Sequence, residues 1–176
     1  MKKGLILVDI QNDYFSGGAM ELAGMDKAAG KAALLLDRFR KEKQPVFHVQ
    51  HLSLRPGSTF FLPNTKGAEI HASVLPAKDE ILVQKHFPNS FRETGLLDHL
   101  REAEVKELVI CGAMSHMCID ATVRAAFDLG FSCTVAADAC ATRDIEFQGV
   151  KVEAAKVHAA FMSALAAVYA KVIRTE

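Results

Sequence analysis

Apolar and polar positions alternate along the chain in blocks that predict strands and helices in turn. Short, nearly continuous apolar runs, typical of strands buried on both faces of a sheet, occupy 4–10, 46–51, 81–85, 108–111 and 133–137. A final short strand is expected at 168–173. Between these runs, apolar residues recur at helical spacing over 26–43, over 94–102, from about residue 117, and over 150–167.

This alternation predicts an α/β protein. Parallel strands need a crossover connection, which is usually a helix, so strands that alternate with helices favour a parallel sheet covered on both faces. We therefore expect a doubly wound, three-layer α/β/α, Rossmann-like fold with six strands, mostly parallel. The segment 52–79 has five Pro or Gly residues and no sustained period, so we interpret it as a loop that shapes a pocket. No linker or repeat interrupts the chain, and we expect a single domain over 1–176.

Composition narrows the class of partner. Lys plus Arg equals Asp plus Glu at 21 each, with no run of like charge, which disfavours nucleic acid and anionic membrane surfaces as partners. A small molecule is the expected partner. No run approaches the ~20 apolar residues of a membrane span. The first residues, MKKGLILVDIQND, are interpreted as a strand rather than a signal peptide, so we expect a cytoplasmic protein. The four cysteines lack C-x-x-C spacing, and we expect reduced thiols.

Candidate chemistry gathers at the carboxyl ends of the predicted strands, where open α/β sheets bind their ligands. Asp9 ends the first strand, Lys85 ends the third, and Cys118 follows the fourth. No G-x-G-x-x-G follows the first strand and no Gly-Lys-Ser/Thr phosphate loop occurs, which disfavours nucleotide binding. If the sheet reverses direction between strands one and four, the three side chains meet in one crevice.

Each of these residues also has a structural interpretation. A lone Cys in an apolar segment is usually a core residue, an Asp at a strand end is often a cap, and a Lys there usually points into water. As a set they make chemical sense, because Asp9 can accept the proton of the Cys118 thiol and Lys85 can hold both in place. Cys118 is also predicted at a strand-to-helix turn, where free amides and the helix dipole favour a thiolate.

Three motifs then identify a family. The segments ILVDIQNDYF around Asp9, KHFPNSF from Lys85, and CGAMSHMCIDATVRAAFDLGF around Cys118, followed by ADAC at 137–140, resemble the isochorismatase-like cysteine hydrolases. That group includes nicotinamidases, carbamoylsarcosine amidases, ureidoacrylate amidohydrolases and streptothricin hydrolases. The resemblance covers nearly the whole chain and implies the isochorismatase-like form of the fold.

The resemblance also implies a mechanism. Asp9, Lys85 and Cys118 would form the catalytic triad, and a cis peptide between Ala113 and Met114 would help the N–H groups of Met114 and Cys118 to form an oxyanion hole. The thiolate would attack an amide-like carbonyl, and water would hydrolyse the resulting thioester without a cofactor. The family usually forms homodimers or homotetramers.

Candidate substrate contacts come from the residues near these motifs. His116 stands two residues before Cys118, so its side chain should point away from the thiol, and we expect it to serve the pocket rather than as the base. The full expected set is Gln11, Phe15, Phe61, Asn89, Phe91, His116 and Met117, with Phe60 and Arg55 as further candidates.

Departures from the family pattern separate its members. The region after the second strand reads FHVQHLSLRPGS, in which His51 or Gln50 matches the metal-binding Asp of nicotinamidases and Ser53 matches the next ligand. We therefore expect no metal and no nicotinamidase activity, with His48, His51 and His71 in packing or substrate contacts.

True isochorismatases generally lack the Cys, so Cys118 favours hydrolysis of a C–N bond. Three alternatives remain at this point: hydrolysis of a small enol-ether acid, a non-catalytic binding or redox-thiol protein on the same fold, and a metal-assisted amidase that uses His51 and His71. The identity of the substrate is left open.

Overall fold

A six-stranded parallel sheet forms the centre of the protein in the computed structural model, which describes residues 2–175. Its order is β3-β2-β1-β4-β5-β8, and all five neighbouring pairs are parallel. The strands are β1 (Lys2–Val8), β2 (Val46–His51), β3 (Ile81–Lys85), β4 (Val105–Ala113), β5 (Ser132–Ala141) and β8 (Lys171–Ile173). The predicted sheet is confirmed.

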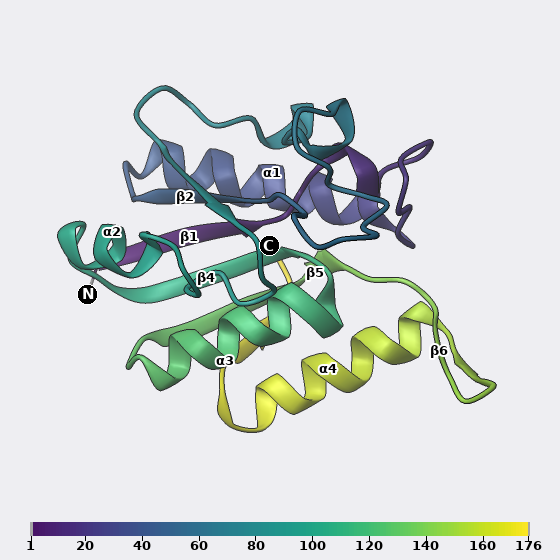
Figure 1. Cartoon of the computed structure of the whole chain (residues 1–176). Coiled ribbons are helices and arrows are strands. Elements are labelled where there is room, and N and C mark those ends of the chain that lie inside the picture. Colours follow the sequence, from purple (N-terminus) through teal and green to yellow (C-terminus); the bar gives the residue numbers. More distant parts are fainter. Residues whose placement is uncertain (1, 176) are drawn as a thin grey trace.

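Helices cover both faces of this sheet, as expected for a three-layer α/β/α fold. The helix α1 (Met25–Lys41) lies on one side, and α3 (Asp120–Asp128) and α4 (Ala154–Val168) lie on the other (Figure 1). The short α2 (Leu96–Glu102) packs against β4. No helix of residues 2–175 is long and apolar enough to cross a bilayer.

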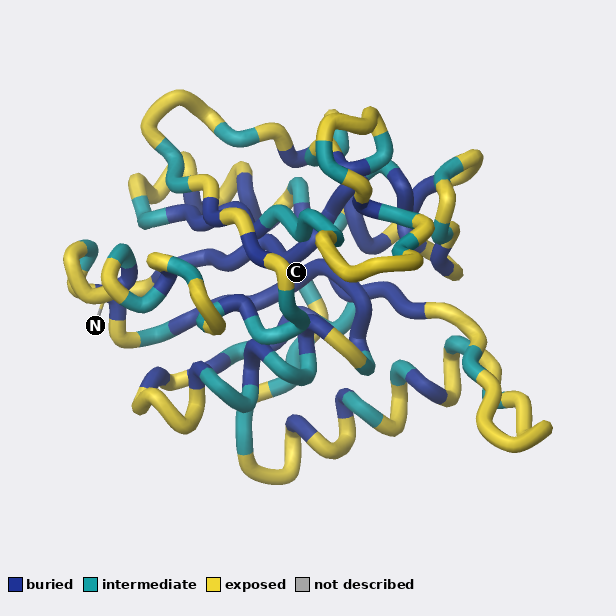
Figure 2. Tube along the Cα trace, viewed as in Figure 1, coloured by how far each residue is buried: buried dark blue, intermediate teal, exposed yellow. Residues whose placement is uncertain are grey.

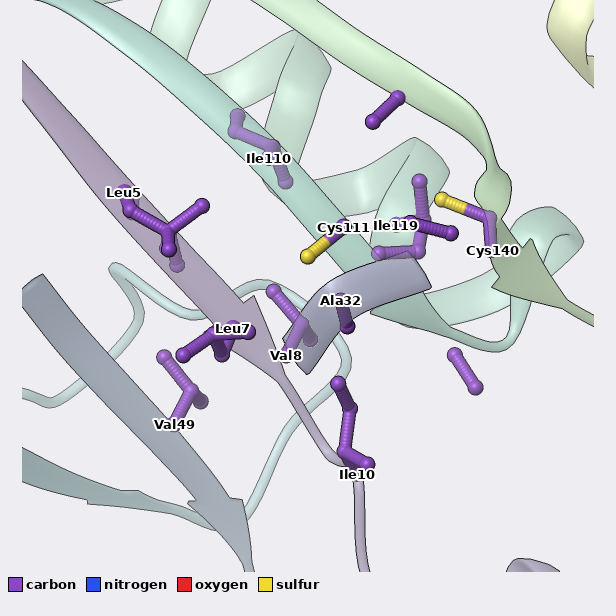
Figure 3. Close-up of a cluster of buried hydrophobic side chains, with 14 of the residues drawn as sticks. Leu5, Leu7, Val8, Ile10, Ala32, Val49, Ile110, Cys111, Ile119 and Cys140 are labelled. Atoms are coloured by element: carbon purple, nitrogen blue, oxygen red, sulfur yellow. The ribbon is translucent and has the colours of Figure 1, made fainter. Parts of the chain in front are cut away.

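The core explains why the strand sequences are nearly all apolar. In β1, every residue from Gly4 to Val8 is buried, because helices cover both faces of the central strand. Figure 3 shows Leu5, Leu7 and Val8 in one buried cluster that also contains Cys111 and Cys140. Those two thiols are therefore core side chains, and all four cysteines are free.

Chain direction within the sheet brings the candidate residues together. The chain runs outward from β1 through β2 to β3, returns to the other side of β1 as β4, and continues to β5 and β8. The point where the strand order reverses therefore lies between β1 and β4, and open α/β sheets bind ligands at such a switch point. This is the arrangement that the convergence of Asp9, Lys85 and Cys118 required.

One predicted boundary was wrong. The helical pattern over 150–167 begins later, at α4, because Val150–Val152 forms β7, the partner of β6 (Ile145–Phe147) in an antiparallel hairpin. Gln148 and Gly149 both have positive φ (50° and 81°), which is typical of the tight turns that join such strands. Figure 2 shows this hairpin as a largely exposed extension beside the start of α4.

The segment 52–79 was correctly predicted as a loop, although it is not featureless. It contains two single turns of 3₁₀ helix, η2 (Lys66–Ala68) and η3 (Ala72–Val74), and a third such turn, η1 (Asn12–Tyr14), follows β1. The carboxyl group of Asp13 in η1 accepts a hydrogen bond from the Phe61 N–H at 2.6 Å. This bond anchors the long loop beside the end of β1.

Candidate active site

Asp9, Lys85 and Cys118 lie close together at the carboxyl ends of the parallel strands. Asp9 directly follows β1 in a left-handed conformation (φ 52°), and Lys85 is the last residue of β3. Cys118 lies in η4 (Ser115–Ile119), a single turn of π-helix between β4 and α3. Because β2 separates β1 from β3, the long side chain of Lys85 is what allows it to reach Asp9.

The Lys85 ammonium is the hub of the site. Its Nζ lies 2.8 Å from Asp9 Oδ2 and donates a hydrogen bond to Cys118 Sγ at 3.2 Å. It also donates to the Phe87 carbonyl at 3.1 Å and lies 3.0 Å from His51 Nδ1. Because an ammonium has no lone pair, the His51 ring fits this contact when Nδ1 presents its own lone pair.

Burial makes these contacts strong. Asp9 and Lys85 have no exposed surface, and Cys118 is 5% exposed. Burial acts to raise the pKa of Asp9, but the charge of Lys85, followed by the contact with His51, outweighs it and holds that pKa below its ordinary value. Burial likewise acts to lower the pKa of Lys85, and the negative charge of Asp9 together with the contact to Cys118 raises it instead. The resting site therefore holds a carboxylate beside an ammonium.

The thiol behaves differently from the sequence prediction. Burial raises the pKa of Cys118, the Asp9 carboxylate raises it further, and the opposing effect of Lys85 is smaller. The net pKa lies well above that of a free thiol, because burial and Asp9 together outweigh Lys85. Cys118 rests as a thiol and needs a base to become a nucleophile.

Asp9 is placed to be that base. One oxygen of its carboxylate and the Cys118 sulfur lie within 4.8 Å of each other. Lys85 holds the carboxylate by charge, yet neither Asp9 oxygen has an aligned hydrogen bond among residues 2–175, so lone pairs remain for an incoming proton. Catalytic contacts in a free enzyme are often longer than in its substrate complex.

The backbone around the thiol has an unusual shape. The peptide bond between Ala113 and Met114 is cis, as the resemblance implied. The Met114 carbonyl accepts hydrogen bonds from the N–H groups of Met117 at 3.0 Å and Ile119 at 3.2 Å, which closes the π-turn that contains Cys118. Single π-turns are frequent at functional sites.

A cleft of about 690 Å³ opens beside the triad, within the size range of small-molecule sites. His51 and Met117 connect it to the triad, since His51 contacts Lys85 and Met117 precedes Cys118. We call it the entrance cleft, and its lining residues are His51, Ser53, Leu54, Arg55, Gly57, Ser58, Thr59, Phe60, His86, Phe87, Pro88, Glu93 and Met117.

Of the expected substrate contacts, Met117 lines the entrance cleft, as do the further candidates Phe60 and Arg55. Gln11 does not: its amide donates to the carbonyls of His51 and Ala68 and accepts from the His51 N–H, so it is a buried bridge that holds the end of β2. The prediction for Gln11 therefore needs correction, because its hydrogen-bonding atoms already have protein partners.

The predicted aromatic contacts belong mainly to the core. Phe61 is completely buried, and Phe15 is buried and stacked on His71 with ring centroids 3.6 Å apart. Phe91 is half-buried and packs against Phe131. These three side chains are placed in packing rather than in the entrance cleft, because they fill the space between the sheet and its loops.

The two remaining polar candidates also lie outside the entrance cleft. Asn89 accepts a hydrogen bond from the Phe91 N–H at 2.9 Å and so closes a local turn. His116 contacts the Thr142 hydroxyl at 2.6 Å and packs its ring edge against Phe161, which points it away from the thiol as predicted. Both residues therefore make local contacts outside the entrance cleft.

The sequence prediction missed most of the polar lining of the entrance cleft, including Ser58, Thr59, His86 and Glu93. One signal was available, because His86 belongs to the KHFPNSF motif that begins at Lys85. The others come from turns whose position depends on contacts distant in sequence.

Asp9, His51 and Cys118 form a group whose ligand atoms lie close enough to hold a metal ion. The Lys85 ammonium, however, lies within 3.2 Å of an atom of each, so it occupies the position that a metal would take. A metal ion bound there would be repelled by the positive charge of Lys85. His48 and His71 lie elsewhere: His48 contacts Glu80, and His71 is stacked on Phe15.

A family model described as the isochorismatase domain matches residues 3–176 of this chain. The chain belongs to the isochorismatase family. It is 53% identical to YddQ of Bacillus subtilis, an uncharacterised isochorismatase family protein, over all of this chain and 98% of that protein. It is 36% identical to a streptothricin hydrolase of Streptomyces noursei, over 81% of this chain and 51% of the relative.

Solved structures show the same relationship. The crystal structure of a protein from Oleispira antarctica, assigned to the isochorismatase hydrolases, matches with a TM-score of 0.95 and 52% identity, over 99% of this chain and 94% of that chain. Members of the family are hydrolases, and this chain is therefore a hydrolase of the isochorismatase family.

Proposed function

We propose that this hydrolase cleaves a C–N bond of a small amide, carbamoyl or lactam-like molecule through a thioester on Cys118. The observation that carries the proposal is the buried Lys85 ammonium, which contacts both the Asp9 carboxylate and the Cys118 sulfur. Burying a carboxylate and an ammonium beside a thiol costs folding free energy. Such clusters are typical of functional sites, where a reaction uses the perturbed groups. The similarity to a streptothricin hydrolase supports hydrolysis of an amide-like bond.

The first half-reaction begins with proton transfer. Asp9 takes the thiol proton as Cys118 Sγ attacks the substrate carbonyl, so that an S–C bond forms and the C=O electron pair moves onto oxygen. We assign the N–H groups of Met114 and Cys118 to hold that oxyanion. When the tetrahedral intermediate collapses, the C–N bond breaks, and Asp9 returns its proton to the leaving nitrogen.

The second half-reaction regenerates the enzyme. Asp9, again a carboxylate, takes a proton from a water molecule that attacks the thioester carbonyl. The C–S bond breaks, the carboxylic acid departs, and the sulfur recovers a proton from Asp9. Lys85 keeps its positive charge throughout, because its pKa is raised, and it stabilises each species in which negative charge is shared between Asp9 and Cys118.

Trapping the covalent intermediate tests the proposal. We would incubate wild type and Cys118→Ala with nicotinamide, carbamoyl and ureido acids, a streptothricin-type lactam and isochorismate, and then acid-quench for mass spectrometry of the intact protein and its peptides. The expected result is amide turnover by wild type, an acyl adduct on the peptide that contains Cys118, and a loss of at least about a thousandfold in Cys118→Ala.

Two other outcomes would contradict the proposal. Hydrolysis of isochorismate that persists in Cys118→Ala would indicate enol-ether chemistry in which the thiol takes no part. A Cys118 that reacts with general thiol reagents but forms no acyl adduct, with no turnover of any compound, would support the binding or redox-thiol alternative.

A further inference from the structure

The entrance cleft carries a positive charge, that of Arg55, which has no acidic partner in the described part of the chain. Its charged lining residues are Arg55 and Glu93, beside the two histidines of the lining. The carboxylate of Glu93 lies 3.5 Å from the Arg92 guanidinium, so that pair is nearly neutral. Arg55 takes part in no salt bridge among residues 2–175.

The backbone holds Arg55 in a defined place. The loop from Ser53 to Phe61 closes on itself through the Ser53 N–H, which donates to the Phe61 carbonyl at 2.8 Å. Phe61 is fully buried and tied to Asp13, so the base of the loop is fixed. At its tip, the Ser58 N–H donates to the Arg55 carbonyl at 3.1 Å, which forms a turn above the entrance cleft.

Apolar side chains also line the entrance cleft. Leu54, Phe60, Phe87, Pro88 and Met117 all line the entrance cleft, and Met117 is 42% exposed there. Arg92 covers the Phe87 ring at 3.6 Å from its centroid and so supports that wall. A ligand in the entrance cleft therefore meets apolar side chains and the positive charge of Arg55 in one site.

We propose that Arg55 is the specificity-determining residue of this site and selects small amides that carry an anionic group, such as a carboxylate, beyond an apolar segment. An arginine fork binds a carboxylate with two parallel hydrogen bonds, and it repels a cationic substrate of similar shape. The inference rests on the proposed function for its scissile bond, but the charge preference of the entrance cleft can be measured without any substrate.

Two small thiol reagents measure that preference. Iodoacetate and iodoacetamide alkylate the same sulfur and differ by one negative charge, so the ratio of their rates at Cys118 cancels the pKa of the thiol. Peptide mapping separates Cys118 from the other three thiols. We expect Arg55→Gln to lower the ratio of iodoacetate to iodoacetamide rates about twofold, the scale of an interaction between two unit charges that are separated by water. The difference should disappear near 1 M salt.

Matched variants make this result specific. Glu93→Gln removes the negative charge of the same cleft and should raise the ratio, whereas Lys66→Gln removes a positive charge from an exposed position outside the lining and should leave it unchanged. An unchanged ratio in Arg55→Gln would overturn the inference. An equal fall in Lys66→Gln would overturn it too, because the net charge of the protein would then explain the effect.

Turnover gives a second readout that separates this inference from the proposed function. For a pair of amides that differ only by carboxylate or methyl at the far end, Arg55→Gln should raise KM for the carboxylate member about tenfold, with kcat unchanged, because the contact is remote from the reacting carbonyl. Arg55→Lys should recover part of the loss. Equal effects on both amides would refute the role of Arg55, whereas turnover that survives Cys118→Ala would refute the proposed function alone.

Discussion

Replacing Lys85 with methionine tests the electrostatic core of the site. Methionine is of similar length and is apolar, so it fills the space while removing the charge. In the wild type the ammonium is fully buried and contacts Asp9, Cys118, His51 and the Phe87 carbonyl. The variant keeps the fold's packing and leaves the Asp9 carboxylate buried without its counterion.

The cost can be worked out contact by contact. A buried ion pair that loses one partner destabilises a protein by about 3–5 kcal/mol, because the remaining charge is left uncompensated. The Phe87 carbonyl loses its hydrogen bond from Lys85, which adds about 1 kcal/mol. Against a total stability of about 5–15 kcal/mol for an ordinary domain, the free energy of unfolding should fall by a large fraction.

The free energy of unfolding should depend on pH in opposite directions in the wild type and in Lys85→Met. In the wild type the pKa of Asp9 is lowered, so its contribution to stability is present above its unfolded pKa and is lost as the pH falls through the folded one. Without Lys85, burial is the dominant influence and the pKa of Asp9 rises above its ordinary value. The carboxyl group then destabilises the variant increasingly as the pH rises through that raised pKa.

Urea unfolding at pH 8 and pH 5.5 measures both points. Lys85→Met should lose several kcal/mol at pH 8 and distinctly less at pH 5.5, and Asp9→Asn/Lys85→Met should recover most of the loss and remove its pH dependence. Lys3→Met, which breaks an exposed pair with Glu107 at 3.7 Å, is the matched control and should cost under about 1 kcal/mol. A loss in Lys85→Met below about 1 kcal/mol at pH 8, or one that the second substitution leaves unchanged, would refute the reasoning.

Four further outcomes follow from the structure. Asp9→Asn should reduce turnover at least about a hundredfold and yet speed iodoacetamide labelling of Cys118 at pH 7, because the carboxylate that raises the pKa of the thiol is gone; slower labelling would contradict this. Glu80→Gln should cost about 2 kcal/mol at pH 7, because Glu80 accepts two hydrogen bonds from Arg40. The pKa of Glu80 is lowered to about 2, so this difference should shrink in urea unfolding as the pH falls from about 4.5 towards 2, and a constant difference would count against it. Gly112→Ala should cost more than about 3 kcal/mol or prevent folding, because Gly112 has φ 124° and a Cβ would overlap the backbone of β1; Gly30→Ala, in an open helical position, is the control. Turnover should be the same with and without a strong chelator, because the ammonium already occupies the position between the possible metal ligands.

The sequence predicted the sheet and the triad for the same physical reason. Strands buried on both faces must be apolar, so polar residues at their ends are conspicuous, and Asp9 and Lys85 stand out against Val8 and Val83. The order of the strands was the uncertain step, since the pattern alone permits several arrangements. Because β4 lies beside β1, Asp9, Lys85 and Cys118 come together in one site.

The parts that the sequence did not predict depend on contacts between distant residues. The strand β7 was taken for the start of a helix, because Val150 and Val152 also fit a helical apolar pattern. Gln11 resembles a substrate-binding residue by type and position. The structure shows that its amide instead donates hydrogen bonds to the carbonyls of His51 and Ala68, which are distant from it in sequence. The entrance cleft likewise depends on how the Ser53–Phe61 loop closes.

The raised pKa of Cys118 changes how the site should be understood. A thiol of low pKa would be a permanent thiolate, which is open to oxidation and weaker as an intrinsic nucleophile. Here burial and Asp9 keep the proton on sulfur, and Lys85 limits the energy needed to move it. In the proposed mechanism the thiolate forms only when a substrate carbonyl is in place to receive it, so the same two charged groups that flank the resting thiol also make it reactive during turnover.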